Sequence, residues 1–503
     1  MKKLKTARQR DRMPGIILSL VFLAAEFAFL ILLVYTGFLQ PVYLLMLIVA
    51  ILLVSGVLHL MVQKFRRRIL FIIGCVFMAV ILTTEGVLSV YIYKTVSALD
   101  SMTGINTETA EINLYVKNSS DLKTLSEMEG KTLGILTELD RDHTDQALLQ
   151  ISGKTGVDIF TKEYPNLETL ANALVTGECQ GVLLNRAYLE VMEQLSGCST
   201  FLKEIRMIDT EKIETVVERK LPERPIQSES TQESAVEQNH VYTVYISGID
   251  TRGEMTASSL SDVNIILTVN TKTKQILMVS TPRDYYVPLS VSGGVPDKLT
   301  HAGIYGVNVC IDTLEMLYDI EVNYYFRINF AGFIKIIDAL GGITIDSDYE
   351  FDTQNVKGYH FEKGANTVDG EQALAFSRER YAFADGDRQR GRDQMKVIRG
   401  ILDKVMTGDF LKNYFSVLDS LEDCFETNVP YDLVSDLMQE QMKDSSKWSV
   451  FSYSTDGTGD TQQPYSMNQK AYVMIPDMDT VDKAKLLMNK VREDFMISEA
   501  DVS

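Results

Sequence analysis

Asp250, Asp262 and Arg283 stand in the sequence where a hairpin and a neighbouring strand would bring them together. Each lies next to a run that has the length and the Val, Ile and Thr content of a β-strand. Carboxylates at a phosphate-handling site usually hold a hard cation such as Mg²⁺, and an arginine grips phosphate oxygens with two N–H groups. The alternative is a surface salt bridge that only closes the hairpin. The strand-like runs are Val241–Ser247, Val263–Val269 and Gln275–Ser280.

The pairing of the second and third runs decides which of these side chains meet. The polar segment Asn270–Lys274 is short enough to close a hairpin between them. If the turn is centred on Lys272, position 262 faces position 282. Asp262 then lies beside Arg283, because cross-strand neighbours are about 5 Å apart at Cβ. Asp250 leaves the end of the first strand, so the sequence predicts two carboxylates and one guanidinium at one edge of a sheet.

A second charged cluster follows a hundred positions later, in the segment Thr367–Lys404. We expect a helix over Gly370–Arg380, a glycine-containing turn, and a second helix from about Arg388 with Asp387 as its N-cap. An arginine-rich helix N-terminus attracts anions through free backbone N–H groups and cationic side chains. The alternative is a salt-bridged solvent face, because acidic residues are interleaved. The residues that could contact an anion are Arg378, Arg380, Arg388, Arg390, Arg392 and, four residues after Arg390, Gln394.

Three long apolar stretches occupy the start of the chain. Each has twenty or more mostly apolar residues, enough to cross a hydrocarbon core of about 30 Å as a helix. Basic residues precede the first stretch and separate the second from the third, whereas the turn between the first and second carries no charge. By the positive-inside rule the protein is a multi-pass membrane protein whose part after Tyr93 is extracellular. The stretches are Ile16–Phe38, Val42–Val62 and Ile69–Tyr93.

The charge of the chain is divided unevenly. The 503 residues carry a net charge of −19, and residues 1–94 carry +8, so the part after residue 94 carries −27. An extracellular body this acidic argues against nucleic acid as a partner, because phosphate contacts need basic surface. The five cysteines lack metal-ligand spacing. We expect buried thiols, with a disulfide between Cys179 and Cys198 as the alternative.

The remaining chain divides into an accessory domain (105–215), a polar linker (216–240) and a second domain (241–503), after the membrane segment (1–94). In the accessory domain, strand-like and helix-like segments alternate, which predicts a small α/β unit. It could bind a ligand or serve as a spacer and docking module. We expect a spacer that is dispensable for chemistry, because the domain has no catalytic constellation.

The second domain is predicted to be an α/β sandwich. After the three strands we expect helices over Thr300–Asp319 and Phe330–Leu340, strands over Asn323–Asn329 and Ile343–Asp346, and one or two helices and a strand after residue 430. His301 is expected to be a packed or capping residue. The chain has no HExxH, CxxC, GxSxG or GxxxxGK[ST] motif.

Residues from about 241 to 475 resemble the LytR-CpsA-Psr family. Seven motifs in the order typical of the family carry this resemblance, and three spans followed by an accessory domain match its CpsA-type members. One departure is Leu260, where the family often has arginine; Arg252 on the same loop could substitute. The motifs are SGIDT (247–251), SDVNI (261–265), TPRDYYVP (281–288), KLTHAGIYG (298–306), NYYFRINF (323–330), SRERY (377–381) and DGDRQRGRDQ (385–394).

The resemblance implies an extracellular, Mg²⁺-dependent phosphotransferase that moves a glycopolymer, a capsular polysaccharide or similar, from a polyprenyl pyrophosphate carrier to peptidoglycan. Asp250 and Asp262 are implied to hold Mg²⁺ and to be catalytic together with Arg283 and Arg390. The alternatives are a non-catalytic regulator that binds an anionic lipid or polymer, and a polyprenyl pyrophosphate pyrophosphatase. The implied pyrophosphate contacts are Arg283, Arg378, Arg380, Arg390, Arg392 and Gln394.

Overall fold

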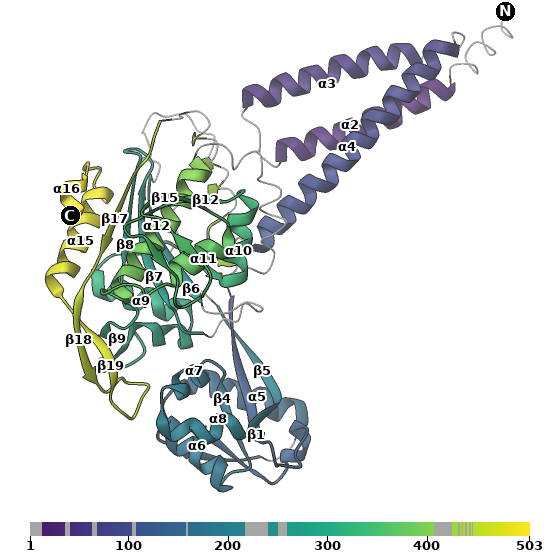
Figure 1. Ribbon diagram of the computed structural model, residues 1–503. Coiled ribbons are helices and arrows are strands. Elements are labelled where there is room, and N and C mark those ends of the chain that lie inside the picture. The colour runs from purple at the N-terminus through teal and green to yellow at the C-terminus, as the bar shows by residue number, and fades with distance from the viewer. Residues whose placement is uncertain are drawn as a thin grey trace, which may run out of the picture. The chain divides into compact units, whose positions relative to one another are not determined.

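The computed structural model describes residues 13–35, 41–62, 68–102, 107–156, 159–216, 240–249, 259–406, 425–430 and 446–503, with a few positions between 431 and 445. The chain forms two compact units. One consists of residues 1–101 with 430–446, and the other of residues 102–429 with 447–503. The second unit contains the accessory domain and the α/β domain that follows it (Figure 1).

The first unit contains three long helices, and each has an apolar stretch long enough to span a membrane. The three predicted apolar helices are confirmed. Glu26 and Glu85, the only acids in these stretches, are buried, and Ser55 donates a hydrogen bond to Glu26. Both carboxylates are therefore shielded by the helices, an arrangement that would lower the cost of placing them in a membrane. The helices are α2 (Met13–Tyr35), α3 (Pro41–Val62) and α4 (Arg68–Met102).

The accessory domain is α/β, as predicted, but it has two more strands than the sequence indicated. The long strands β1 and β5 enter and leave the domain side by side and extend the sheet to the order β3-β2-β4-β1-β5. Cys179 and Cys198 are buried free thiols, so the disulfide alternative is wrong. The elements are β1 (Thr107–Lys117), β2 (Thr132–Leu136), α5 (Arg141–Thr155), β3 (Phe160–Tyr164), α6 (Leu167–Thr176), β4 (Gly181–Asn185), α7 (Tyr188–Glu193), α8 (Ser199–Glu204) and β5 (Ile205–Val216).

The second domain is built on a six-stranded mixed sheet with the order β16-β11-β6-β7-β8-β17. The β7–β8 hairpin pairs Asn270 with Gln275, so the turn is centred between Lys272 and Thr273, half a residue beyond the predicted centre. The strands of this sheet are β6 (Val241–Ile249), β7 (Val263–Asn270), β8 (Gln275–Ser280), β11 (Tyr324–Asn329), β16 (Phe425–Thr427) and β17 (Ser449–Ser454).

Helices cover both faces of this sheet (Figure 1). On β7, Ile266 points into a core with α9 and α15, whereas Ile265 and Leu267 point toward α12 on the other face. This alternation follows from the period of two along a strand. The other elements are β9 (Tyr286–Pro288), β10 (Pro296–Lys298), η3 (Leu299–Tyr305), α9 (Val307–Tyr318), α10 (Phe330–Ala339), β12 (Ile343–Ser347), β13 (Phe351–Asp352), β14 (His360–Phe361), β15 (Gly364–Val368), α11 (Gly370–Arg378), α12 (Asp387–Met406), β18 (Gly457–Gln462), β19 (Ala471–Pro476), α15 (Met478–Arg492) and α16 (Glu499–Val502).

The predicted helix over Thr300–Asp319 is interrupted. Gly306 has a φ of +107°, a conformation that favours glycine and ends the turn η3 before α9 begins. A side chain there would also collide with Glu108, because an added Cβ would lie 1.9 Å from its Oε2. After residue 430 the chain supplies three strands instead of the one predicted, and β17 joins the central sheet beside β8.

The accessory domain packs against the η3 turn and the start of α9. The carboxylate of Glu108 accepts a hydrogen bond from the Val307 backbone N–H at 2.6 Å, at the N-terminus of α9. Asn185, at the end of β4, donates to the Ile304 carbonyl at 3.2 Å, and the Tyr188 and Tyr305 hydroxyls are 3.0 Å apart. The end of a parallel strand is where α/β domains commonly bind ligands. Here Ile304 covers the end of β4. This favours the interpretation of the domain as a spacer and docking module over that of a ligand-binding domain.

Glu108 makes the stability of this contact depend on pH. Burial raises the pKa of Glu108 from 4.5 to about 7, although nearby Arg327 opposes the rise. Because the folded pKa is the higher one, the protein binds this proton more tightly when folded, so stability falls as the pH rises from 4.5 to 7. We expect the Glu108→Gln protein to gain up to about 3 kcal/mol over wild type at pH 8 and little at pH 5. Melting temperatures of the two proteins in detergent at pH 5 to 8 check this. A difference that does not change with pH would contradict it.

Candidate functional site

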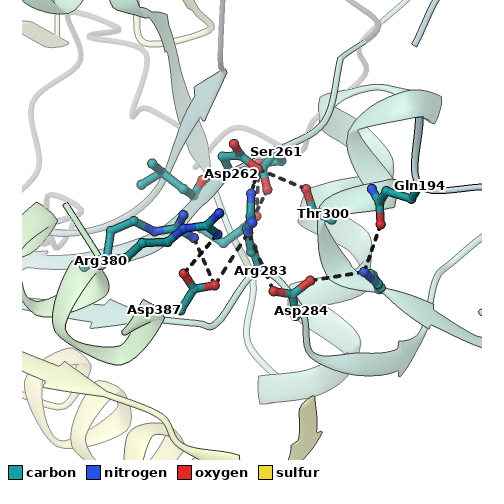
Figure 2. Close-up of polar contacts among 12 residues, drawn as sticks. Gln194, Ser261, Asp262, Arg283, Asp284, Thr300, Arg380 and Asp387 are labelled. Carbon is teal, nitrogen blue, oxygen red and sulfur yellow. Dashed lines mark hydrogen bonds and ion pairs between the residues drawn. The ribbon is translucent and has the colours of Figure 1, made fainter. Parts of the chain in front are cut away.

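Asp262 and Arg283 lie side by side at the open end of the β7–β8 hairpin, just before β7 begins and just after β8 ends (Figure 2). The Arg283 Nη1 donates to the Asp262 Oδ1 at 2.8 Å, and the Thr300 hydroxyl donates to the same oxygen at 3.4 Å. Backbone bonds fix the frame, because the Asp262 N–H donates to the Gly248 carbonyl and the Thr300 N–H donates to the Arg283 carbonyl. The predicted neighbourhood of Asp262 and Arg283 is confirmed. Asp250 lies outside the described residues.

Asp387 joins this pair to the second charged cluster. Its carboxylate lies 3.8 Å from Arg283 Nε, 3.7 Å from Arg380 Nη1 and 3.4 Å from Arg390 Nη2. Asp387 is the first residue of α12 and not its N-cap, which corrects the prediction. None of the three contacts is short enough for a strong hydrogen bond. Asp387 therefore lies near all three arginines but does not form a strong hydrogen bond with any of them.

Two buried atoms at the centre of the site have no hydrogen-bond partner among the described residues. They are Arg283 Nε and Asp387 Oδ1. Burial opposes the charge of Arg283, but Asp262, Asp284 and Asp387 together outweigh this effect and raise its pKa. Arg283 therefore stays charged while one of its donors is unused. An anion in the pocket would supply the missing acceptor.

Arg390 lies in the same pocket as Arg283, and their charges act on each other. Its side chain is only 13% exposed. Burial and the charge of Arg283 lower the pKa of Arg390, although Asp387 and Asp262 oppose the change. Two like charges held this close favour an anion between them, because the anion removes their repulsion.

The other residues predicted to contact the pyrophosphate differ in the contacts that their side chains already make within the chain. Gln394 lines the pocket and donates to the Ser377 carbonyl at 3.4 Å. Arg378 stacks over the Phe330 ring at 4.3 Å, and Arg380 lies over the Tyr381 ring at 4.7 Å. Arg392 differs, because Nη2 is already 2.7 Å from Asp385 and 2.6 Å from Gln389. Arg392 is therefore already held by residues of its own helix and of the turn before it.

The charged pocket adjoins a larger, mostly apolar cavity. The pocket, of about 90 Å³, and the cavity, of about 510 Å³, share Asp262, Arg283, Arg390 and Gln394 in their walls. The cavity lies between one face of the central sheet and helices α10, α11 and α12. Its apolar walls include Ile246, Leu267, Phe326, Ile328, Phe333, Ile336, Leu374, Val397, Ile401 and Val405. A charged head group at one end and a long hydrocarbon at the other would satisfy both parts.

Several residues at this site were not predicted. Asp284 lies 3.6 Å from Arg283 Nε, and the buried Lys298 lies 3.5 Å from Asp284. Both belong to motifs that carry the family resemblance, which was the available signal. His301 is buried beside Asp297 at 2.7 Å, as expected of a packed residue. Arg252, the suggested substitute for the arginine absent at position 260, lies outside the described residues.

The chain was compared with known protein families, curated proteins and solved structures. The model of the LytR_cpsA_psr family matches residues 207–486. A polyisoprenyl-teichoic acid–peptidoglycan teichoic acid transferase TagU from Enterococcus faecalis is 37% identical over 38% of this chain and 62% of its own length. A protein of the same name from Bacillus cereus is 32% identical over 57% of this chain and 89% of its own length.

Solved structures of similar chains have low TM-scores. A Streptococcus agalactiae protein is 26% identical over 54% of this chain and 93% of its own, with a TM-score of 0.45. TagT bound to LI-WTA is 26% identical over 55% of this chain and 98% of its own, with a TM-score of 0.40. The family match covers more than half of this chain and includes all the described residues of the charged pocket and the apolar cavity. The chain belongs to the LytR-CpsA-Psr family.

Proposed function

We propose that this protein transfers a glycopolymer, a capsular polysaccharide or a similar polymer, from a polyprenyl pyrophosphate carrier to a hydroxyl of peptidoglycan. The observation that carries the proposal is that the arginine pocket adjoins the apolar cavity and that Arg283 and Arg390 line both. A polyprenyl pyrophosphate has the same two parts, an anionic head and a hydrocarbon chain. The names of the two relatives, both teichoic acid transferases acting on peptidoglycan, support the same class of reaction.

In this reaction the acceptor oxygen attacks the phosphorus that carries the polymer. A new O–P bond forms, the P–O bond to the bridging oxygen breaks, and polyprenyl phosphate leaves with the bond's electron pair. The hydroxyl proton is lost to a carboxylate of the site. Negative charge grows on the leaving phosphate, so the buried charges of Arg283 and Arg390 stabilise the transition state more than the ground state. The cavity holds the prenyl chain and thereby fixes the pyrophosphate against them.

Mg²⁺ fits the charge and the donors of this site. The described pocket brings Arg283, Arg380 and Arg390 together with three carboxylates, which offset their charge. The arginines alone therefore leave a pyrophosphate incompletely neutralised. Both hydrogen bonds to Asp262 reach Oδ1, which leaves Oδ2 as a ligand oxygen of the kind that Mg²⁺ prefers. We propose that Asp262, with Asp250, holds Mg²⁺, which would neutralise the pyrophosphate oxygens.

Replacing Asp262 with Asn should remove the stimulation of transfer by Mg²⁺ without removing lipid binding. The amide keeps the size of the side chain but loses the charge that attracts the cation. Transfer measured against Mg²⁺ concentration, and binding of polyprenyl phosphate to the same protein, check the two halves of this prediction. Asp284→Asn is the matched control, because it changes a carboxylate that contacts Arg283 from the opposite side. Equal Mg²⁺ dependence in wild type and Asp262→Asn would contradict it.

The proposed function is tested with the full chain reconstituted in liposomes with a labelled lipid-linked polymer and isolated peptidoglycan. Transfer gives label that becomes insoluble together with the peptidoglycan, and Arg390→Ala should lose it. A regulator would bind the lipid-linked polymer without turnover. A pyrophosphatase would release soluble labelled polymer at the same rate without acceptor. Either outcome would refute the transferase function.

The three spans place the site outside the cell if the basic segments are cytoplasmic, as we propose. A protease added to intact cells should then degrade the part of the protein after Tyr93 and leave an N-terminal fragment. An epitope at the N-terminus and another at the C-terminus report the two parts on a blot. Cells opened with detergent are the control. Protection of the C-terminal epitope in intact cells would contradict the orientation.

A further inference from the structure

We propose that the accessory domain positions the arginine site, with Gln194 as the positioning residue. Gln194 lies just after α7 of the accessory domain, and among the described residues it is linked to the arginine site through Lys298. The inference deepens the proposed function, because it takes Arg283 as a ligand of the pyrophosphate. In this arrangement Gln194 acts on Arg283 through Lys298 and Asp284.

A line of polar contacts runs from the accessory domain to Arg283 (Figure 2). The Lys298 Nζ donates to the Gln194 Oε1 at 3.2 Å and lies 3.5 Å from the Asp284 Oδ1. The other carboxylate oxygen of Asp284 lies 3.6 Å from Arg283 Nε. That same Nε is the buried donor that has no hydrogen-bond partner among the described residues. The line therefore ends at the atom that an anion would engage.

Asp284 lies between two cations, Lys298 and Arg283, and both attract its carboxylate. Lys298 is only 6% exposed and Asp284 only 8%, so water screens their attraction weakly. The amide oxygen of Gln194 competes with Asp284 for the ammonium of Lys298. Without that oxygen, Lys298 keeps Asp284 as its remaining charged partner and moves toward it. Asp284 then turns from Arg283 Nε, and the guanidinium loses one of the carboxylates that orient it.

Contacts at the other end of the same segment support this role. Glu108 holds Val307, just after the η3 turn, and Thr300 within the turn donates to Asp262. Leu260, where the family resemblance leads one to expect arginine, packs against the core of the accessory domain. The accessory domain thus touches the active-site segment both before and after η3. This argues against the expectation that the domain is dispensable for chemistry.

The test compares Gln194→Met with Gln469→Met in the full chain. Gln194→Met keeps the length of the side chain and removes the acceptor for Lys298. Gln469→Met removes a different bond of the same interface, a 2.9 Å donation to the Gln194 backbone carbonyl, and leaves Lys298 untouched. Because Gln194 is exposed on its outer side, both proteins should fold, and melting temperatures verify this. Gln194→Asn, one methylene too short, provides a second variant.

Two readouts are measured on each protein. We expect Gln194→Met to raise the dissociation constant for inorganic pyrophosphate about 3- to 10-fold and to lower kcat by a similar factor, whereas Gln469→Met changes either by less than about twofold. The KM for the lipid-linked polymer should hardly change, because the apolar cavity supplies most of its binding. Combining Gln194→Met with Lys298→Met should cost no more than Lys298→Met alone, because both act through one contact.

The outcomes separate this inference from the proposed function. Pyrophosphate binding by Gln194→Met equal to that of wild type overturns the inference, as do additive losses in the double variant. Weakened pyrophosphate binding confined to Gln194→Met supports it even if wild type transfers no polymer, a result that would refute only the proposed function. Equal losses in Gln194→Met and Gln469→Met would mean that the interface acts on stability alone, and would also overturn it.

Discussion

Arg283→Ala and Arg390→Ala should each lower the rate of polymer transfer about 10²- to 10³-fold. Both guanidinium groups are largely shielded from water and lie in one pocket, and each would face the leaving phosphate. Removing either costs the stabilisation that the enzyme gives to the growing charge. The measurement is single-turnover transfer with the reconstituted full chain, so that binding and product release do not mask the chemical step.

The variant that combines Arg283→Ala with Arg390→Ala gives the more decisive test. If both arginines contact the same anion, losing the second costs much less than losing the first, so the two losses are far from additive. Arg399→Ala is the matched control, because it removes an exposed arginine from the same helix. Fully additive losses, or an Arg390→Ala protein with the wild-type rate, would show that the two arginines do not share a substrate.

The local part of this site was predictable from the sequence, because short-range rules determine it. The hairpin between β7 and β8 brings Asp262 to Arg283 through strand spacing alone, and a half-residue error in the turn did not separate them. Arg390 and Gln394 were expected on one side of a helix because they are four residues apart. Both line the pocket.

The contacts between distant segments could not be predicted in the same way. Nothing near Asp387 in the sequence indicates that it would lie between Arg283, Arg380 and Arg390, since α12 must first pack across the sheet. Strand β17 joins β8 from 174 positions away, and its pairing is set by the core and not by a turn. The accessory strand β1 does carry the alternation of a half-buried strand, with Ala110, Ile112 and Leu114 buried, so it could have been predicted. Strand β5 is largely polar and has no comparable pattern.

The presence of the apolar cavity could not be predicted from the sequence either. Its wall residues were visible in the sequence as the apolar faces of ordinary core elements, such as Ile401 and Val405 on α12. Whether such faces close into a packed core or leave room between them depends on the distance between helices and sheet. That distance is set by packing across the whole domain. The helix predicted over Phe330–Leu340 forms one wall, with Phe330, Phe333 and Ile336 lining the cavity.

Replacing Ile328 with Asp should weaken the binding of polyprenyl phosphate by at least about 100-fold, because a carboxylate held against the prenyl chain costs a few kcal/mol. Ile328 lies on β11 and forms part of the cavity wall, and its side chain is only partly buried by protein. The empty cavity can therefore hydrate the new carboxylate, so the protein should fold.

The affinity for inorganic pyrophosphate separates an effect on the cavity from an effect on the arginine pocket. Pyrophosphate has no chain, so its binding to Ile328→Asp should equal that to wild type, whereas Arg283→Ala should lose it. Ile328→Val is the matched control: it removes one methylene from the same wall and should change lipid affinity by less than about tenfold. If Ile328→Asp binds polyprenyl phosphate as wild type does, the prenyl chain lies elsewhere, and the position of the cavity beside the pocket no longer supports the transferase function. If it loses lipid and pyrophosphate together, the substitution has disturbed the arginines, and the lipid measurement says nothing about the cavity.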